Sequence, residues 1–302
     1  MSQVMYMKEF EQVRDLLPET VKMALNEVSD PGKVEEIRLR ANMPGTYLTE
    51  GREICLNNGG RNVILNPEDL ARMLRRASDH ALYAVQGQLA EGFLTLEGGH
   101  RLGVCGRAVT EGGRVKALTD FQAVNLRLAR AVPGAADGAV NLLWSRPAST
   151  LILGPPGRGK TTVLRDLIRQ ISDRFRYRVS LVDERGEVAA CCGGNPQLPV
   201  GKHTDVLSLC PKAKGIELVL RAMGPEWIAL DEITAAEDVE AIIRASYSGV
   251  RFLATAHAWS REDLNRRPLY RTLMEAQVFE NLVEIRPDRG LNCCSAGEEG
   301  RR

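Results

Sequence analysis

The sequence lacks long apolar runs, an excess of charge of one sign and paired cysteine motifs. No stretch comes near the roughly 18 uninterrupted apolar residues of a membrane-spanning helix, so we expect no such span. Residues 1–19 carry charges throughout and contain no apolar segment of the kind found in secretory signals. We therefore expect a cytoplasmic protein that is peripheral to a membrane only through partners or its surface.

The charge balance argues against a general nucleic-acid coat protein. The 302 residues include 40 Lys and Arg against 39 Asp and Glu, giving a net charge of +1. Proteins that coat nucleic acid normally carry a strong basic excess, so nucleic acid is not the expected partner. The hydrophobic share of 44% and the aromatic share of 5% are ordinary for a soluble globular chain.

The seven cysteines include no C-x-x-C pair, and two adjacent pairs suit neither disulfides nor tetrahedral zinc. A metal site could be assembled from Cys191, Cys192, His203 and Cys210, but that spacing matches no known ligand pattern. We expect reduced, mostly buried thiols.

The N-terminal part of the chain predicts a small α+β domain. Apolar residues recur at helical spacing over residues 1–30, and short alternating runs over 34–56 favour strands. A second helix begins at Asn66, with Pro67 in its first turn, and runs to about Arg76.

A breaker-rich segment, residues 131–139, marks the expected domain boundary. We expect an α+β domain over 1–135, a mainly parallel α/β domain over 136–290, and a flexible tail over 291–302. The second domain alternates apolar strands with amphipathic helices, which implies a parallel sheet covered on both faces. Its expected strands are 149–153, 179–183, 227–231 and 250–256, and its expected helices are 160–175, 213–223 and 235–247.

The strongest chemical signal is a phosphate-binding loop between a predicted strand and a predicted helix. The sequence fits G-x-x-x-x-G-K-[ST] in the context that this motif requires. The expected nucleotide-binding residues are Gly154, Pro155, Pro156, Gly157, Arg158, Gly159, Lys160, Thr161 and Thr162. Backbone N–H groups would surround the phosphates, Lys160 would reach the β- and γ-phosphates, and the Thr161 hydroxyl would complete a Mg²⁺ shell.

A second acidic signal follows one intervening strand later, in WIALDE over residues 227–232. Asp231, at the end of the strand, would hold Mg²⁺ through water. Glu232, one residue further on, would act as the general base for the attacking water. The sequence has no N-K-x-D motif for guanine and no L-S-G-G-Q transporter signature, so we expect ATP and Mg²⁺.

Several segments resemble the hexameric type II/IV secretion ATPases, which have a RecA-like P-loop fold. LRAMGPEWIALDEI and ASYSGVRFLATAHA are similar to the Walker B and histidine boxes of that class, and DERGE over 183–187 resembles its acidic box. One departure is Asp231, where the class usually has Gly, and another is that Ile233-Thr234 follow in place of an Arg.

Across nearly the whole chain, the sequence resembles the stage III sporulation protein AA family of endospore-forming bacteria. The segments that carry this resemblance are EEIRLRANMP, LYAVQGQLAEGFLTLEGGHRLGVCGRAV, GPPGRGKTT and VDERGE. The resemblance implies a homohexameric ring that energises a channel between mother cell and forespore, with membrane proteins of that channel as partners.

Five further residues are candidates for the hydrolytic step. His257 closes a strand beside the one bearing Glu232 and could sense the γ-phosphate, although a structural role is open. Glu184 and Glu187 follow a strand whose end faces the nucleotide, where either could position water or simply lie in a surface loop. Arg101 and Arg107 are candidate arginine fingers, from the same or a neighbouring subunit.

Two other functions remain open at this stage. A nucleic-acid motor of the same fold would show nucleic-acid-stimulated turnover. A nucleotide-gated scaffold would bind ATP and scarcely hydrolyse it.

Overall fold

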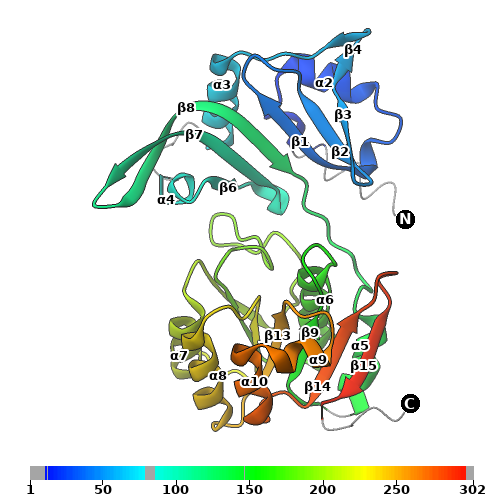
Figure 1. Ribbon diagram of the computed structural model, residues 1–302, viewed down its shortest axis with the longest axis vertical. Coiled ribbons are helices and arrows are strands. Elements are labelled where there is room, and N and C mark those ends of the chain that lie inside the picture. The colour runs from blue at the N-terminus through cyan, green and yellow to red at the C-terminus, as the bar shows by residue number, and fades with distance from the viewer. Residues whose placement is uncertain (1–10, 12, 79–85, 146, 297–302) are drawn as a thin grey trace. The chain divides into compact units, whose positions relative to one another are not determined.

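The computed structural model describes residues 11, 13–78, 86–145 and 147–296, and the chain forms two compact units (Figure 1). The N-terminal unit comprises Met1–Arg130 with Cys192–Gln197, and the C-terminal unit comprises Ala131–Cys191 with Leu198–Arg302. Each unit has its own sheet and its own buried core. Among the helices of the described residues, none combines the length and apolar character needed to cross a membrane.

The N-terminal unit is built on a six-stranded antiparallel sheet of order β3-β2-β1-β8-β7-β6. Its strands are β1 (Val34–Arg40), β2 (Thr46–Thr49), β3 (Arg52–Cys55), β6 (Phe93–Thr95), β7 (Arg101–Glu111) and β8 (Arg114–Arg127), with a small ladder of β4 (Asn57–Asn58) and β5 (Arg61–Asn62) beside it. The helical segments are α2 (Glu19–Asn26), η1 (Pro31–Lys33), α3 (Pro67–Ala77), α4 (Gln86–Ala90) and η3 (Glu97–Gly99).

Alternation along the strands gives this sheet one apolar and one polar face. Ile37 and Leu39 of β1 are fully buried in a cluster that also contains residues of α2, α3 and α4. Arg38 and Arg40 alternate with them and remain partly exposed. The helix predicted from Asn66 is confirmed as α3, which begins with a reciprocal capping box between Asn66 and Asp69.

The single helix predicted over residues 1–30 is wrong in its extent. Residues 1–10 lie outside the described part of the chain, and helical turns before residue 15 give way to α2 only at Glu19. Pro18 separates the two pieces with an extended backbone (φ −59°, ψ 149°), because its ring removes an N–H donor and disfavours continuation of a preceding helix.

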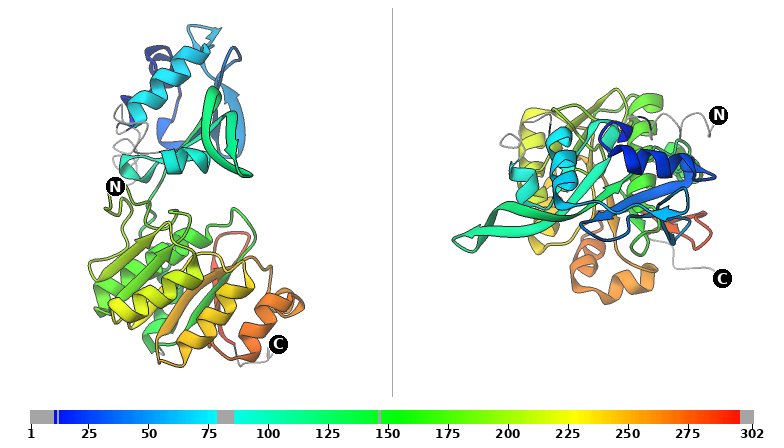
Figure 2. Two further views of the ribbon diagram at one scale, coloured as in Figure 1. Left: turned by 90° about the vertical axis from the view of Figure 1, so that its left-hand side faces the viewer. Right: turned by 90° about the horizontal axis from the view of Figure 1, so that it is seen from above.

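The C-terminal unit, drawn in green to red in Figure 2, contains a mainly parallel sheet with helices packed beside it. The sheet has seven strands in the order β11-β10-β12-β13-β9-β14-β15. All neighbouring strands are parallel except the β14–β15 pair. The strands are β9 (Thr150–Leu153), β10 (Val179–Asp183), β11 (Thr204–Ser208), β12 (Trp227–Leu230), β13 (Arg251–Ala256), β14 (Asn281–Ile285) and β15 (Leu291–Ser295). The mainly parallel α/β fold class is therefore confirmed, together with all four predicted strands.

Helices cover both faces of this sheet. They are α5 (Asp137–Ser145), α6 (Lys160–Phe175), α7 (Lys212–Ala222), α8 (Ala236–Ser246), α9 (Arg261–Arg266) and α10 (Pro268–Glu275). In β9, Leu151 and Leu153 pack in the cluster that contains side chains of α7 to α10, whereas Ile152 packs with α5 and α6. A strand that alternates between two apolar clusters is buried on both faces, which explains its uninterrupted apolar sequence.

The prediction of a flexible tail over residues 291–302 is wrong for its first part. Leu291–Ser295 form β15, which pairs with β14 from Asn281↔Ser295 to Ile285↔Leu291. The pairing supplies backbone hydrogen bonds that this short sequence does not reveal. Residues 297–302 lie outside the described residues.

Candidate active site

A cavity of about 370 Å³ opens where the central strands of the parallel sheet end. It is lined by Pro156, Gly157, Gly159, Lys160, Thr161, Arg185, Glu187, Asp231, Glu232, Thr255 and His257. These residues follow or terminate β9, β10, β12 and β13, which are neighbours in the sheet. The carboxyl ends of parallel strands meet at one edge, and this is where ligands of open α/β sheets bind.

The loop after β9 takes its shape from two glycines in the left-handed region. Gly157 has φ +75° and Gly159 has φ +92°, conformations that L side chains rarely adopt. Gly159 directly precedes α6, so the loop leads into the positive end of a helix of 16 residues. Loop N–H groups and a helix N-terminus together favour an anion, and a phosphate group fits that chemistry.

Lys160 is the buried cation of this loop. The residue is 6% exposed, and its Nζ donates a hydrogen bond to the Pro155 carbonyl over 3.1 Å. Burial lowers the pKa of Lys160, although the carboxylates of Glu232 and Asp231 oppose that shift. A negatively charged ligand would reinforce the charged form of the ammonium.

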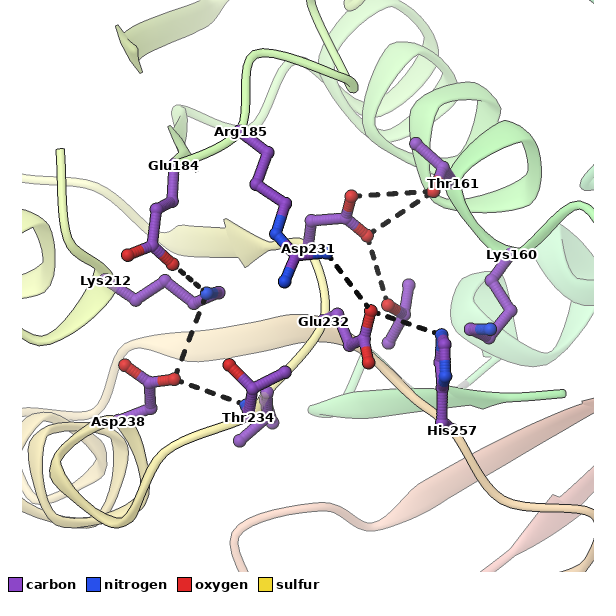
Figure 3. Close-up of polar contacts among 12 residues, drawn as sticks. Lys160, Thr161, Glu184, Arg185, Lys212, Asp231, Glu232, Thr234, Asp238 and His257 are labelled. Carbon is purple, nitrogen blue, oxygen red and sulfur yellow. Dashed lines mark hydrogen bonds and ion pairs between the residues drawn. The ribbon is translucent and has the colours of Figure 1, made fainter. Parts of the chain in front are cut away.

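Asp231 and Thr161 bring hard oxygen donors together at the cavity wall (Figure 3). Thr161 Oγ1 lies 3.5 Å from both carboxylate oxygens of Asp231, and Thr255 Oγ1 donates to Asp231 Oδ1 over 3.1 Å. Burial raises the pKa of Asp231, and the nearby carboxylates of Glu187 and Asp183 raise it further. A hydroxyl and a carboxylate within a cluster of buried negative charge fit a magnesium ion.

The described residues contain no cluster of three or more His, Cys, Asp or Glu side chains arranged to hold a metal ion. A magnesium ion at Asp231 and Thr161 would therefore take its other ligands from nucleotide phosphates and water, as Mg²⁺ in nucleotide sites usually does.

Glu232 lies at the centre of the polar side chains in the cavity. Its Oε2 is 3.2 Å from His257 Nε2 and 3.9 Å from Arg185 Nη1 (Figure 3). Burial and the Lys160 ammonium lower the pKa of His257, while Glu232 opposes that shift. The lowered pKa favours the neutral imidazole near pH 7, which lies against the Glu232 carboxylate.

The loop after β10 is held by a buried carboxylate and a buried guanidinium. Asp183 accepts hydrogen bonds from the N–H groups of Glu187, Val188 and Ala189. Burial raises the pKa of Asp183, although these N–H groups oppose the shift. Arg165, one turn beyond Thr161 on α6, donates to the carbonyls of Val188 and Glu187. The phosphate-binding helix and the acidic loop are thus fixed to each other, and Glu187 lines the cavity.

Glu184 points elsewhere. Its carboxylate accepts a hydrogen bond from Lys212, the first residue of α7, and Lys212 Nζ also lies 3.9 Å from Asp238 Oδ2 (Figure 3). Asp238 in turn accepts from the N–H groups of Thr234 and Ala235. The structure therefore separates the two acidic candidates, with Glu187 at the cavity and Glu184 in an ion-pair network beside it.

Four residues of the predicted loop are not among those that line the cavity, namely Gly154, Pro155, Arg158 and Thr162. Arg158 Nη1 donates to the Pro287 carbonyl. Arg101 and Arg107 both belong to β7 of the N-terminal unit. The Arg101 guanidinium stacks 3.8 Å above the Phe93 ring, and Arg107 Nε lies 2.8 Å from Asp120 Oδ2.

Sequence reasoning missed three residues of the site. Thr255 lies two residues before His257, so strand alternation places both on one side of β13 and could have identified it. Arg185 lies inside the acidic box, between the two glutamates that drew attention to that loop, and its Nη1 is 3.9 Å from Glu232 Oε2. Arg165 carried no signal, because a charged residue on a helix is usually exposed.

A glycine loop ending in Lys160 at the start of a helix, with Asp231 and Glu232 after β12, a parallel strand separated from β9 by β13, is the arrangement of a RecA-like P-loop domain. The chain belongs to the family described as sporulation stage III, protein AA, whose model matches residues 7–291. The family resemblance expected from the sequence is thereby confirmed.

Individual relatives agree with that assignment. Stage III sporulation protein AA of Bacillus subtilis (strain 168) is 37% identical over 286 residues, covering 92% of each chain. The ATPase DotB of Legionella pneumophila superposes with a TM-score of 0.55 at 15% identity, over 97% of this chain and 80% of DotB. The pilus retraction motor PilT, solved with bound ADP, gives 0.58 at 17% identity, over 86% of this chain and 77% of PilT. At such identities the structures show a shared fold.

Proposed function

We propose that this protein is a Mg²⁺-dependent ATPase that works as a ring-forming motor. The observation that carries the proposal is the contact between Glu232 and His257 in the same cavity as Lys160 and Thr161. The cavity thus combines groups suited to phosphate binding, metal binding and proton transfer.

Each of these side chains has a defined task in hydrolysis. Lys160 binds the β- and γ-phosphates of ATP, and Thr161 with Asp231 holds the magnesium ion. Bound Mg²⁺ supplies neutralisation of the charge that develops on the phosphates. Glu232 accepts the proton of the attacking water, and His257, whose Nε2 lies 3.2 Å from that carboxylate, keeps it in place.

We further propose that the ring is a homohexamer on the cytoplasmic face of a sporulation-specific channel between mother cell and forespore. The family assignment and the fold shared with DotB and PilT support this role. Membrane proteins of the channel would be the partners. Arg101 or Arg107 would supply positive charge to the γ-phosphate, within one subunit or between two.

The decisive experiment compares the wild-type protein with Lys160→Ala and with Lys214→Ala, an exposed lysine on α7 that serves as the matched control. We expect Mg²⁺-dependent phosphate release and calorimetric ATP binding in the wild type and the control. Lys160→Ala should lose both, because the variant lacks the buried ammonium of the cavity.

Unchanged ATP binding by Lys160→Ala would contradict the phosphate-loop assignment. Binding without turnover in the wild type would favour a nucleotide-gated scaffold, and strong stimulation by nucleic acid would favour a nucleic-acid motor.

A further inference from the structure

A tyrosine outside all the recognised motifs bridges the two backbone segments that carry Glu232 and His257. Tyr270 belongs to α10 and is 5% exposed. Its hydroxyl accepts a hydrogen bond from the His257 N–H over 3.3 Å and donates one to the Ile233 carbonyl over 3.0 Å. Ile233 directly follows Glu232, so one oxygen atom contacts the backbone at His257 and next to Glu232.

The position of this hydroxyl is set by packing. Tyr270 lies in the same buried cluster as Leu264 and Leu273, which joins α9 and α10 to the sheet. Ile233 is itself fully buried, and its N–H donates to the Thr255 carbonyl on β13 over 3.1 Å. A side chain whose rotamer is fixed by its surroundings can hold two loops in register, whereas a surface tyrosine could not.

Glu232 and His257 meet at the centre of the cavity. Glu232 Oε2 and His257 Nε2 meet at 3.2 Å, and each side chain extends from a loop whose backbone contacts the Tyr270 hydroxyl. Both loops lie beyond the ends of their strands, so the regular ladder between β12 and β13, which ends at Leu230↔Ala254, does not fix them. Past that point the Ile233 N–H bond to the Thr255 carbonyl connects the two segments, and the Tyr270 hydroxyl extends the connection to His257.

We propose that Tyr270 is a positioning residue that holds Glu232 and His257 against each other and thereby sets the rate of the hydrolytic step. This inference rests on the proposed ATPase function. The hydrogen bonds of Tyr270 reach the backbone at His257 and Ile233, away from Lys160 and Thr161, so its effect falls on turnover and leaves nucleotide affinity unchanged. Small displacements of a catalytic group are enough, since about 1 Å can cost roughly 10²-fold in rate.

The test is Tyr270→Phe, which keeps the ring and its packing and removes only the bridging oxygen. The matched control is Tyr247→Phe, at a tyrosine that is 84% exposed. We expect kcat for ATP hydrolysis to fall by at least about 10-fold in Tyr270→Phe, with KM and ATP affinity within about threefold of wild type. The control should match the wild type in all three quantities.

A second measurement does not depend on turnover. Amide hydrogen exchange at His257 should become at least about 10-fold faster in Tyr270→Phe, relative to Leu151 in the core strand β9. Exchange that stays unchanged means that the hydroxyl does not hold the segment, and it overturns the inference whatever the activity of the variant.

The remaining outcomes separate this inference from the proposed function. Wild-type turnover in Tyr270→Phe, beside an inactive Glu232→Gln variant, overturns the role of Tyr270 and leaves ATP hydrolysis in place. Equal losses of kcat and ATP affinity identify Tyr270 as a general structural residue and also overturn it. Absence of hydrolysis in the wild type removes the proposed function, and the rate-setting role falls with it.

Discussion

At the scale of single residues, the chemistry of the site depends on how three acidic side chains near the cavity are partnered. Glu232 has a histidine at 3.2 Å and an arginine at 3.9 Å, and it lines the cavity, where the attacking water would lie. Glu184 has Lys212 as a direct partner, which fixes its side chain away from the cavity. Glu187 lines the cavity and is the alternative base.

Substitution of Glu232 by Gln should leave ATP binding intact and reduce hydrolysis by about 10²-fold or more, because the amide keeps the shape and loses the base. Phosphate release and calorimetric binding provide the two readouts. Glu217→Gln, on the exposed side of α7, is the matched control and should behave like the wild type. If turnover survives in Glu232→Gln and disappears in Glu187→Gln, the water is held by Glu187 instead.

At the scale of elements, the first turn of α7 connects two loops of the site. Lys212 has a side chain that is 4% exposed, and it contacts Glu184 after β10 and Asp238 of α8. The helix is pressed against β10 at Gly215, where a Cβ atom would come within 2.4 Å of Val182 Cγ1. This close approach directs Lys212 between the acidic loop and the segment that follows Glu232.

Replacement of Lys212 by Met should lower the free energy of unfolding of the C-terminal unit by about 2 kcal/mol, because Glu184 and the buried Asp238 lose their cation. Glu184 is about one-third exposed, and its hydration keeps the loss below that of a fully buried pair. Urea unfolding followed by circular dichroism measures the change. Lys214→Met, at a lysine with 62% side-chain exposure on the same helix, should shift the transition by less than about 0.5 kcal/mol.

Adding Glu184→Gln to Lys212→Met should recover part of the stability, because the double variant buries one negative charge fewer. A double variant less stable than Lys212→Met would show that the network is not held by charge pairing.

At the scale of the whole molecule, the N-terminal unit contributes a hairpin that extends beyond its own sheet (Figure 1). β7 and β8 pair as far as Glu111↔Arg114, with register shifts between Cys105 and Arg107 and between Val109 and Thr110. By contrast, β6 reaches only Gly103 on β7, and β1 reaches only Ala123 on β8. In the outer part of the hairpin, β7 and β8 therefore pair with each other alone among the described strands of their sheet. Arg107 lies in this part, with its side chain 72% exposed.

In a ring, we expect Arg107→Ala to bind ATP within a few-fold of wild type and to lose turnover by about 10³-fold, the scale observed for arginine fingers. The matched control is Arg114→Ala, on the same hairpin. Light scattering with and without ATP checks that the ring forms. Activity recovered on mixing Arg107→Ala with Glu232→Gln subunits would show that the two groups meet between subunits. Wild-type turnover in both Arg107→Ala and Arg101→Ala would remove the N-terminal unit from catalysis.

The sequence by itself determined the parallel sheet and the phosphate-binding loop, because both depend on local rules. Buried parallel strands such as β10 are continuous apolar runs, and α6 begins and ends at the residues expected from its periodicity. The loop is specified by glycines whose φ values few other residues adopt. Asp231 and Glu232 could be identified because they directly follow an apolar strand that lies further along the chain than that loop.

Only the tertiary structure decided which polar side chains meet. β15 was missed because its strand character comes from pairing with β14, and the first helix was overextended because Pro18 breaks a periodicity that continues past it. Glu184 and Glu187 look equivalent in the sequence, yet Lys212 binds only one of them. Tyr270 had no motif to mark it, since its role depends on the packing of α10 against strands distant in the chain. Contacts of this kind follow from long-range packing, which a pattern of neighbouring residues does not encode.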